Sequence, residues 1–181
     1  MKKLLGFLSL ILLTSIIVLS SSSQIFAQEK YTIGGRGPAG GWIFYLSDKT
    51  HGMEAAERDL TDTTNWSNSP FVLTGASGKE IGTGKANTDA IIAVQKAGDY
   101  AAKACKDLVA GHTNDWFLPS KDELALMYNK IKGAGGFSSD SSYWSSSEDS
   151  EQKAWNQYFF NGGQHSITKN SNANVRCVRT F

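Results

Sequence analysis

The chain has 181 residues, of which 40% are hydrophobic and 11% aromatic, and this is enough apolar material for one packed core. Its 18 basic residues nearly balance its 17 acidic ones, so the composition gives no sign of nucleic-acid binding. The 18 glycines and 3 prolines are too few for a collagen-like stalk, and no internal repeat indicates a solenoid. We therefore expect one globular domain.

The N-terminus has the pattern of a secretory signal peptide. Two lysines after the first methionine form a positive region, a mostly apolar stretch covers 4–19, and a short polar segment ends at the small residue Ala27. We expect cleavage after Ala27, which divides the chain into a 1–27 leader and a 28–181 domain that is secreted, periplasmic or at the cell surface. An uncleaved anchor is the alternative, but about 16 apolar residues are fewer than the roughly 20 that span a bilayer. No comparable apolar run follows, so no membrane span is expected in the mature chain.

Strands are predicted near both ends of the mature chain. After Gly40 and Gly41, the run Trp42–Leu46 is aromatic and β-branched, as is typical of a buried strand. The segment 175–181 has a composition that favours a closing strand. We expect these two strands to pair and to bring the termini together.

Helices are predicted in the middle of the chain. From 88 to 109 apolar residues recur at helical spacing, and Gly98 marks a break. A second helix begins with Ser120 and Glu123, which form a capping box, and it ends at Gly133. The apolar stripe of this second helix consists of Leu124, Met127, Tyr128 and Ile131.

Export affects how the two cysteines, Cys105 and Cys177, are interpreted. Thiols outside the cytoplasm tend to oxidise, and an even count permits one intramolecular disulfide. Buried free thiols are the alternative. In the chain-entropy model, closing a loop of about 70 residues would contribute about 4 kcal/mol to stability.

The region 137–174 combines polar residues with large aromatic ones, which indicates ordered loops and short strands rather than a linker. Amide groups pair with hydroxyls and aromatic faces cover apolar patches, so such a region suits recognition of a sugar or a protein. The candidate contact residues are Trp155, Asn156, Gln157, Asn161, Gln164, His165, Lys169 and Asn170, with Tyr158 as a second stacking platform. The alternative for each is a solvated loop residue.

Enzyme motifs are incomplete in this sequence. Gly35, Gly37 and Gly40 match the pattern G-x-G-x-x-G, but they precede a strand instead of opening a helix and so cannot form a phosphate cradle. No G-x-S-x-G elbow marks the serine of a hydrolase. We therefore expect no enzymatic activity.

Metal sites are not expected either, and no cofactor is assigned. The three histidines are isolated from one another and from the cysteines, so a zinc site lacks ligands at workable spacing. Four carboxylates could supply oxygen ligands to calcium, but they lack the spacing of an EF-hand. They are Asp140, Glu148, Asp149 and Glu151.

Six blocks of sequence, in this order, resemble the bacterial Lcl C-terminal domain family. They are G-G-W-I-F-Y at 40–45, I-G-T-G-K-A-N-T at 81–88, D-W-F-L-P-S-K-D-E-L at 115–124, Y-W-S-S-S-E at 143–148, A-W-N-Q at 154–157 and V-R-C-V-R at 175–179. The family is named for the terminal domain of a collagen-like adhesin, and many of its members have no assigned function. The resemblance extends from about Tyr31 to Phe181.

The resemblance implies an α+β, C-type-lectin-like fold, in which two helices flank small mixed or antiparallel sheets and the N- and C-terminal strands pair. A disulfide in that fold often joins the first helix to the last strand, in agreement with Cys105 and Cys177. The calcium-sugar signatures E-P-N and W-N-D of animal lectins are missing here. Formylglycine-generating enzymes share the fold, but their chemistry uses two neighbouring cysteines, so that activity is not expected.

The leading hypothesis is thus a secreted, non-enzymatic, adhesin-like module that recognises a glycan or a protein through 137–174. One alternative is a structural or assembly domain of the bacterial envelope, as a trimer or another homo-oligomer. Another is a retroelement-diversified binding protein, because 156–174 is rich in the residue types substituted in such proteins. The mature chain has a charge near −1 and dispersed basic residues, which does not favour sulfated polysaccharides.

Overall fold

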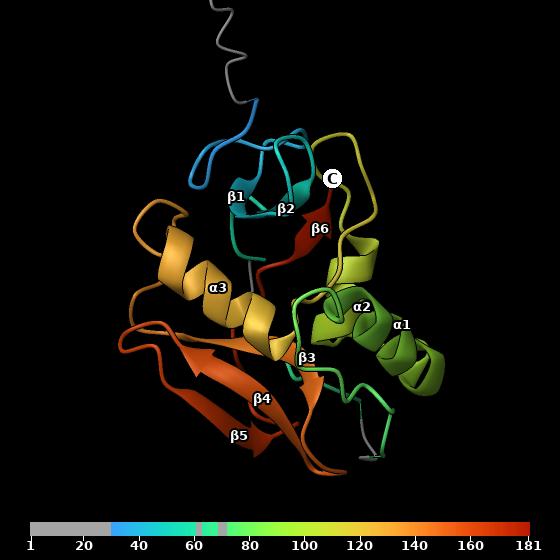
Figure 1. Cartoon of the computed structure of the whole chain (residues 1–181). Coiled ribbons are helices and arrows are strands. Elements are labelled where there is room, and N and C mark those ends of the chain that lie inside the picture. The colour runs from blue at the N-terminus through green and yellow to red at the C-terminus, as the bar shows by residue number, and fades with distance from the viewer. Residues whose placement is uncertain (1–29, 61–62, 69–71) are drawn as a thin grey trace, which may run out of the picture.

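A computed structural model of the chain describes residues 30–60, 63–68 and 72–181. These residues form three helices and two three-stranded antiparallel sheets, an α+β architecture as predicted (Figure 1). The predicted leader 1–27 lies outside the described residues. Within the described ranges, no helix has both the length and the hydrophobicity needed to cross a membrane.

The first sheet contains β1 (Trp42–Leu46), β2 (Gly52–Ala55) and β6 (Val178–Thr180), in the order β1-β2-β6. The predicted direct pairing of the first and last strands was wrong, because β2 lies between them. A short turn after β1 leads into β2, which pairs with β1 as its antiparallel neighbour. β2 therefore occupies the edge of β1 where β6 was expected, and β6 pairs with β2 instead. The two ends of the domain still meet, since the rings of Tyr31 and Phe181 lie 4.9 Å apart.

The first predicted helical region is in fact two helices, α1 (Gly84–Gln95) and α2 (Ala101–Asp107), which are separated around Gly98 as expected. The start of α1 lies four residues before the predicted one. Its first residue packs directly on the capping box of the next helix: a Cβ at Gly84 would lie 2.3 Å from the Glu123 carboxylate, so only glycine fits there.

The third helix, α3 (Lys121–Ile131), confirms the predicted capping box. The Ser120 hydroxyl accepts a hydrogen bond from the backbone N–H of Glu123, and the Glu123 carboxylate accepts one from the N–H of Ser120. The same carboxylate accepts a 2.7 Å bond from the N–H of Gly82. Burial raises the pKa of Glu123 above its ordinary value, while these backbone bonds act in the opposite direction.

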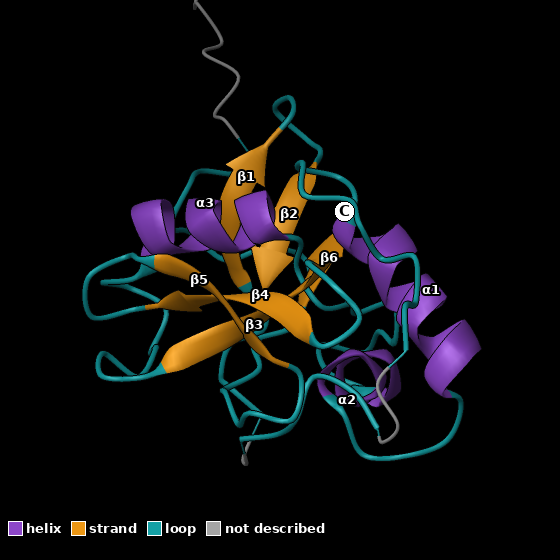
Figure 2. Ribbon diagram, turned by 90° about the horizontal axis from the view of Figure 1, so that it is seen from below, coloured by secondary structure: helices purple, strands orange, loops and turns teal. Residues whose placement is uncertain are grey.

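The second sheet contains β3 (Ser142–Glu148), β4 (Lys153–Tyr158) and β5 (Gln164–Thr168), in that order. Helix α3 packs on β3 and β4 with one side and on β1 with the other, so it lies between the two sheets (Figures 1 and 2). Helices α1 and α2 lie together beside the sheets. The β4–β5 hairpin therefore has one face toward α3, and β5 forms an outer edge of this sheet.

Among the described residues, the apolar interior consists of two clusters. One surrounds α3 and includes Phe44, Leu124 and Phe159. The other contains the disulfide between Cys105 in α2 and Cys177 just before β6, whose formation was predicted. This bridge joins a helix to the C-terminal strand segment, and both half-cystines are buried.

We expect removal of the disulfide to weaken the fold substantially. The double variant Cys105→Ala/Cys177→Ala should lose about 4 kcal/mol in the free energy of unfolding, because the unfolded chain regains the freedom of a long loop. Urea denaturation at neutral pH measures this loss. An unchanged denaturation midpoint, or no difference between oxidised and reduced wild-type protein, would contradict the expectation.

Candidate functional site

The structure distributes the eight predicted contact residues over several environments. Side chains alternate between the two faces along β4 and β5, and the register pairs Asn156 with His165 and Gln157 with Gln164. Asn161 lies in the turn between the two strands, and Asn170 is exposed beyond the opposite end of β5. The eight residues therefore do not form one surface.

For three of these residues the prediction of an exposed contact was wrong, because their side chains lie in the interior. Asn156, Gln157 and Lys169 are 1%, 2% and 0% exposed. The composition of the segment suggested a polar loop, but the strand alternation directs Asn156 and Gln157 into packed surfaces. Gln157 is held there by a 3.1 Å bond from its Nε2 to the carbonyl of Gly162.

Lys169 belongs to a buried ion pair. Its Nζ lies 2.5 Å from Oε1 of Glu148 and donates a 3.0 Å bond to the carbonyl of Val72. It also lies 4.7 Å from the centre of the Trp66 ring. Glu148 accepts further bonds from the backbone N–H groups of Thr74 and Gly75. The pair thus fixes the 72–75 loop to the second sheet, and Glu148 is unavailable as the calcium ligand considered above.

Trp155 and Gln164 lie on the α3 side of the hairpin. The Nζ of Lys121 is 3.9 Å from the centre of the Trp155 ring, and the Nζ of Lys79 is 5.4 Å from it. Gln164 donates a 2.9 Å bond from Nε2 to the carbonyl of Lys121. A sugar that stacked on Trp155 would first have to displace a lysine, so these side chains serve mainly to hold the start of α3 on the sheet.

An exposed aromatic group remains at the turn of the hairpin. We call Tyr158, Phe160, Asn161 and His165 the hairpin surface. The rings of Phe160 and His165 lie 5.4 and 4.8 Å from that of Tyr158, and Phe160 is 56% exposed. The side chain of Asn161 accepts a 2.8 Å bond from the N–H of Gly163, which orients its amide. Phe160 was not among the predicted contacts; its position next to an Asn-Gly-Gly turn is the signal that could have identified it.

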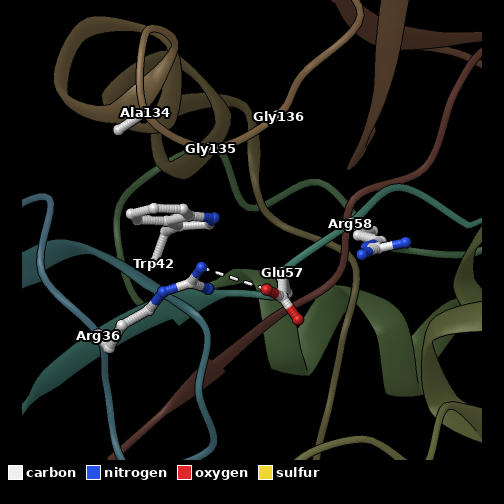
Figure 3. Close-up of a pocket in the computed structure, with 7 residues that line it drawn as sticks. All are labelled: Arg36, Trp42, Glu57, Arg58, Ala134, Gly135 and Gly136. Carbon is white, nitrogen blue, oxygen red and sulfur yellow. Dashed lines mark hydrogen bonds and ion pairs between the residues drawn. The ribbon is translucent and has the colours of Figure 1, made fainter.

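A second feature, which the sequence did not reveal, is a cleft at the edge of the first sheet (Figure 3). We call it the Trp42 cleft. It has a volume of about 330 Å³ and is lined by Arg36, Trp42, Glu57, Arg58, Ala134, Gly135 and Gly136. The Arg36 guanidinium covers the indole of Trp42 at 3.7 Å and pairs with Glu57 at 3.2 Å. These residues come from three segments, 36–42, 57–58 and 134–136, so no local sequence motif could have predicted the cleft.

The adjoining Leu60 cavity shares Glu57 and Arg58 with the Trp42 cleft. Its volume is about 230 Å³. The other residues that line it are Ala56, Asp59, Leu60, Leu108 and Ala110. The two hollows therefore lie next to each other, with Glu57 and Arg58 common to both.

The walls of the Trp42 cleft are fixed from the inside by Arg176, which is fully buried. Its guanidinium donates to the carbonyls of Ala56 at 3.0 Å, Gly135 at 2.7 Å and Gly136 at 3.1 Å. Its Nε donates to Asp59 at 2.6 Å. Burial lowers the pKa of Arg176, the Asp59 carboxylate opposes that shift, and an arginine keeps its charge in any case.

Tyr143 completes this buried network. Its hydroxyl donates a 2.6 Å bond to Asp59 and accepts a 2.7 Å bond from the N–H of Ser138. Burial raises the pKa of Tyr143 far above its ordinary value, and the neighbouring Asp59 carboxylate raises it further. Folding therefore favours the protonated form of the Tyr143 hydroxyl.

The family model of the Lcl C-terminal domain matches residues 55–179 of the chain. The chain belongs to this family, as the six blocks indicated. Comparison with curated proteins gives no match. One similar solved structure is a fimbrial protein from Bacteroides ovatus ATCC 8483, with 14% sequence identity and a TM-score of 0.49. The alignment covers 85% of this chain and 40% of the fimbrial chain, so the protein spans about two fifths of that neighbour's length.

We expect Lys169→Met to destabilise the protein by about 3 to 5 kcal/mol, because the variant leaves the Glu148 carboxylate buried without its ion-pair partner. Chemical denaturation measures the effect. The control is Lys153→Met, which replaces an exposed lysine in β4 and should change stability little. Adding Glu148→Gln to Lys169→Met should cost less than the sum of the two single changes. Wild-type stability of Lys169→Met would contradict the structural role.

The raised pKa of Tyr143 predicts a loss of stability in alkali. A tyrosine in the unfolded chain ionises near pH 10, whereas folded Tyr143 keeps its proton, so stability falls as the pH rises through that value. Near-ultraviolet absorbance should show that Tyr143 ionises only when the protein unfolds. The variant Tyr143→Phe should be less stable at neutral pH, and its deficit should shrink above pH 10. A deficit independent of pH would contradict the assignment.

Proposed function

We propose that the mature chain is a secreted, non-enzymatic binding module that recognises a glycan through the hairpin surface. Membership of a family named for the terminal domain of an adhesin supports a role in recognition. We also propose the C-type-lectin-like fold, which the helix-to-terminal-strand disulfide and the shared sheet of β1 and β6 support. The signal-peptide pattern supports export.

The observation that carries the proposal is the exposed ring of Phe160 beside Tyr158 and His165. Exposed aromatic rings that touch one another offer an apolar patch on which the C–H face of a sugar ring can pack. Asn161 and His165 add polar groups next to this patch, and such groups bond to hydroxyls. The combination is smaller and better defined than the predicted 137–174 region.

The bridged state of Cys105 and Cys177 supports a non-enzymatic role. Formylglycine-type chemistry would use free thiols, and the described part of the chain contains none. The same residues contain no group of three or more side chains that could hold a metal ion.

Assembly into homo-oligomers is a second candidate function, and one feature favours it. β5 is an outer strand of the second sheet, so its backbone offers an edge to which a strand of another chain can add.

A binding protein whose residues are diversified by a retroelement is a variant of the proposed binding function. The burial of Asn156, Gln157 and Lys169 would restrict variable positions to exposed residues of 156–174, such as Asn161, His165 and Asn170.

A glycan array with the purified 28–181 domain tests the proposed function. We expect saturable binding to at least one glycan, and Phe160→Ala should weaken it about tenfold or more because the stacking platform is lost. Leu73→Ala is the matched control, since Leu73 is 65% exposed elsewhere on the surface and is not part of the hairpin surface. Parallel arrays with calcium and with a chelator determine whether a metal takes part.

Binding that Phe160→Ala and His165→Ala leave unchanged would overturn the assignment of the hairpin surface. A negative array with a folded, disulfide-bonded sample would overturn the glycan as ligand. Light scattering that shows a stable oligomer, disrupted by a proline in the outer edge of β5, would favour the assembly role instead.

A further inference from the structure

We propose that the Trp42 cleft and the Leu60 cavity together form a groove that binds an acidic peptide segment, with a carboxylate at Arg58 and an aliphatic side chain against Leu60. This site shares no residue with the hairpin surface. The inference therefore stands independently of the proposed glycan binding.

The groove is preorganised. In its Trp42 cleft, one wall is formed by Glu57 and Arg58 and the other by the 134–136 loop, and Arg176 donates hydrogen bonds to the carbonyls of Ala56, Gly135 and Gly136. Since this guanidinium is fully buried, the spacing of the walls is fixed from inside the protein. A binding site whose walls are already in place loses less entropy when a ligand binds.

Charge in the groove favours an acidic ligand. Arg36 is engaged with Glu57 and with the carbonyl of Gly40, and Asp59 is engaged with Arg176. Arg58 forms no ion pair among the described residues, and Figure 3 shows it apart from the Arg36–Glu57 pair. Among the described residues the groove therefore has one positive charge in excess, and the Arg58 guanidinium, which none of them pairs, is suited to a carboxylate.

The apolar surface on either side of Arg58 favours a peptide. On one side, Arg36 covers one face of the Trp42 indole, and the missing side chain of Gly136 leaves room in the cleft, since a Cβ at Gly136 would meet no atom within 4 Å. Leu60 and Leu108 form the walls on the other side. A segment with an acidic residue next to an aliphatic one matches this order of surfaces, whereas the hydroxyls of a sugar would find few partners beside two leucines.

The backbone of the groove can also take part. The N–H groups of Glu57 and Arg58 donate to no acceptor in the described part of the chain. Both residues are exposed at the groove, and the proposed peptide would lie extended along them with its carbonyl oxygens toward these donors. The side chains of such a peptide would provide specificity and its main chain would add affinity.

An NMR titration of the isotope-labelled 28–181 domain tests the proposal. The probes are acetylated and amidated pentapeptides Gly-X-Glu-X-Gly, with X as Leu, Ile, Val or Ala, and matched peptides with Gln in place of Glu. We expect at least one Glu peptide to shift the indole N–H signal of Trp42 saturably, and its Gln counterpart to bind about tenfold more weakly.

Protein variants locate the site. Arg58→Ala should reduce affinity about tenfold by removing the partner of the carboxylate. Ala134→Trp, a change at an exposed position, should abolish binding by filling the cleft. Lys49→Ala removes one positive charge from an exposed turn and should have no effect. Phe160→Ala should likewise leave peptide affinity unchanged. Peptide binding and glycan binding are therefore tested by different variants, and one proposal can fail without the other.

Three outcomes would overturn the inference. They are the absence of saturable Trp42 shifts with every peptide at the solubility limit, equal affinity of Glu and Gln peptides, and wild-type affinity in Arg58→Ala and Ala134→Trp. Trp42 shifts produced by a neutral glycan and not by the peptides would assign the groove to carbohydrate and likewise overturn it.

Discussion

The buried guanidinium of Arg176 is the interaction on which the arrangement of the long loops depends. A charged group in an apolar interior needs partners, and each nitrogen of the Arg176 guanidinium donates either to the Asp59 carboxylate or to backbone carbonyls from two distant segments. Tyr143 bonds to the same Asp59 carboxylate and brings β3 into the network. Movement of either segment away from Arg176 would leave its carbonyls without these donors. The hydrogen bonds to Arg176 therefore hold both segments in position.

Buried glutamates act on the same principle elsewhere in the domain. Glu54 is fully buried and accepts bonds from the N–H groups of Ala39 and Gly41 as well as from Arg179. Glu148 and Glu123 hold other loops in the same way. Short sheets cannot bury enough apolar surface to position so much irregular chain, and ionic groups with specific directions do so instead. Rigid loops are in turn what a binding surface requires.

Local patterns in the sequence predicted local structure well. The capping box and the break at Gly98 both depend on neighbours in the chain, and the structure contains each of them. The position of β2 between β1 and β6 was missed, because strand order depends on pairing between distant segments. The candidate site was predicted only in part: His165 and Asn161 are exposed, but strand alternation and the Glu148 carboxylate place three other candidates inside.

The sequence by itself predicted the family and, through that resemblance, the α+β class; the cysteine count predicted the disulfide, and the capping box and apolar stripe predicted the extent of α3. Only the tertiary structure decided which polar residues reach solvent and which serve buried charges. It alone assembled the Trp42 cleft, whose walls come from segments separated by about half of the chain. The physical reason is that burial and charge pairing depend on the whole set of contacts around a residue, and neighbours in sequence supply only some of them.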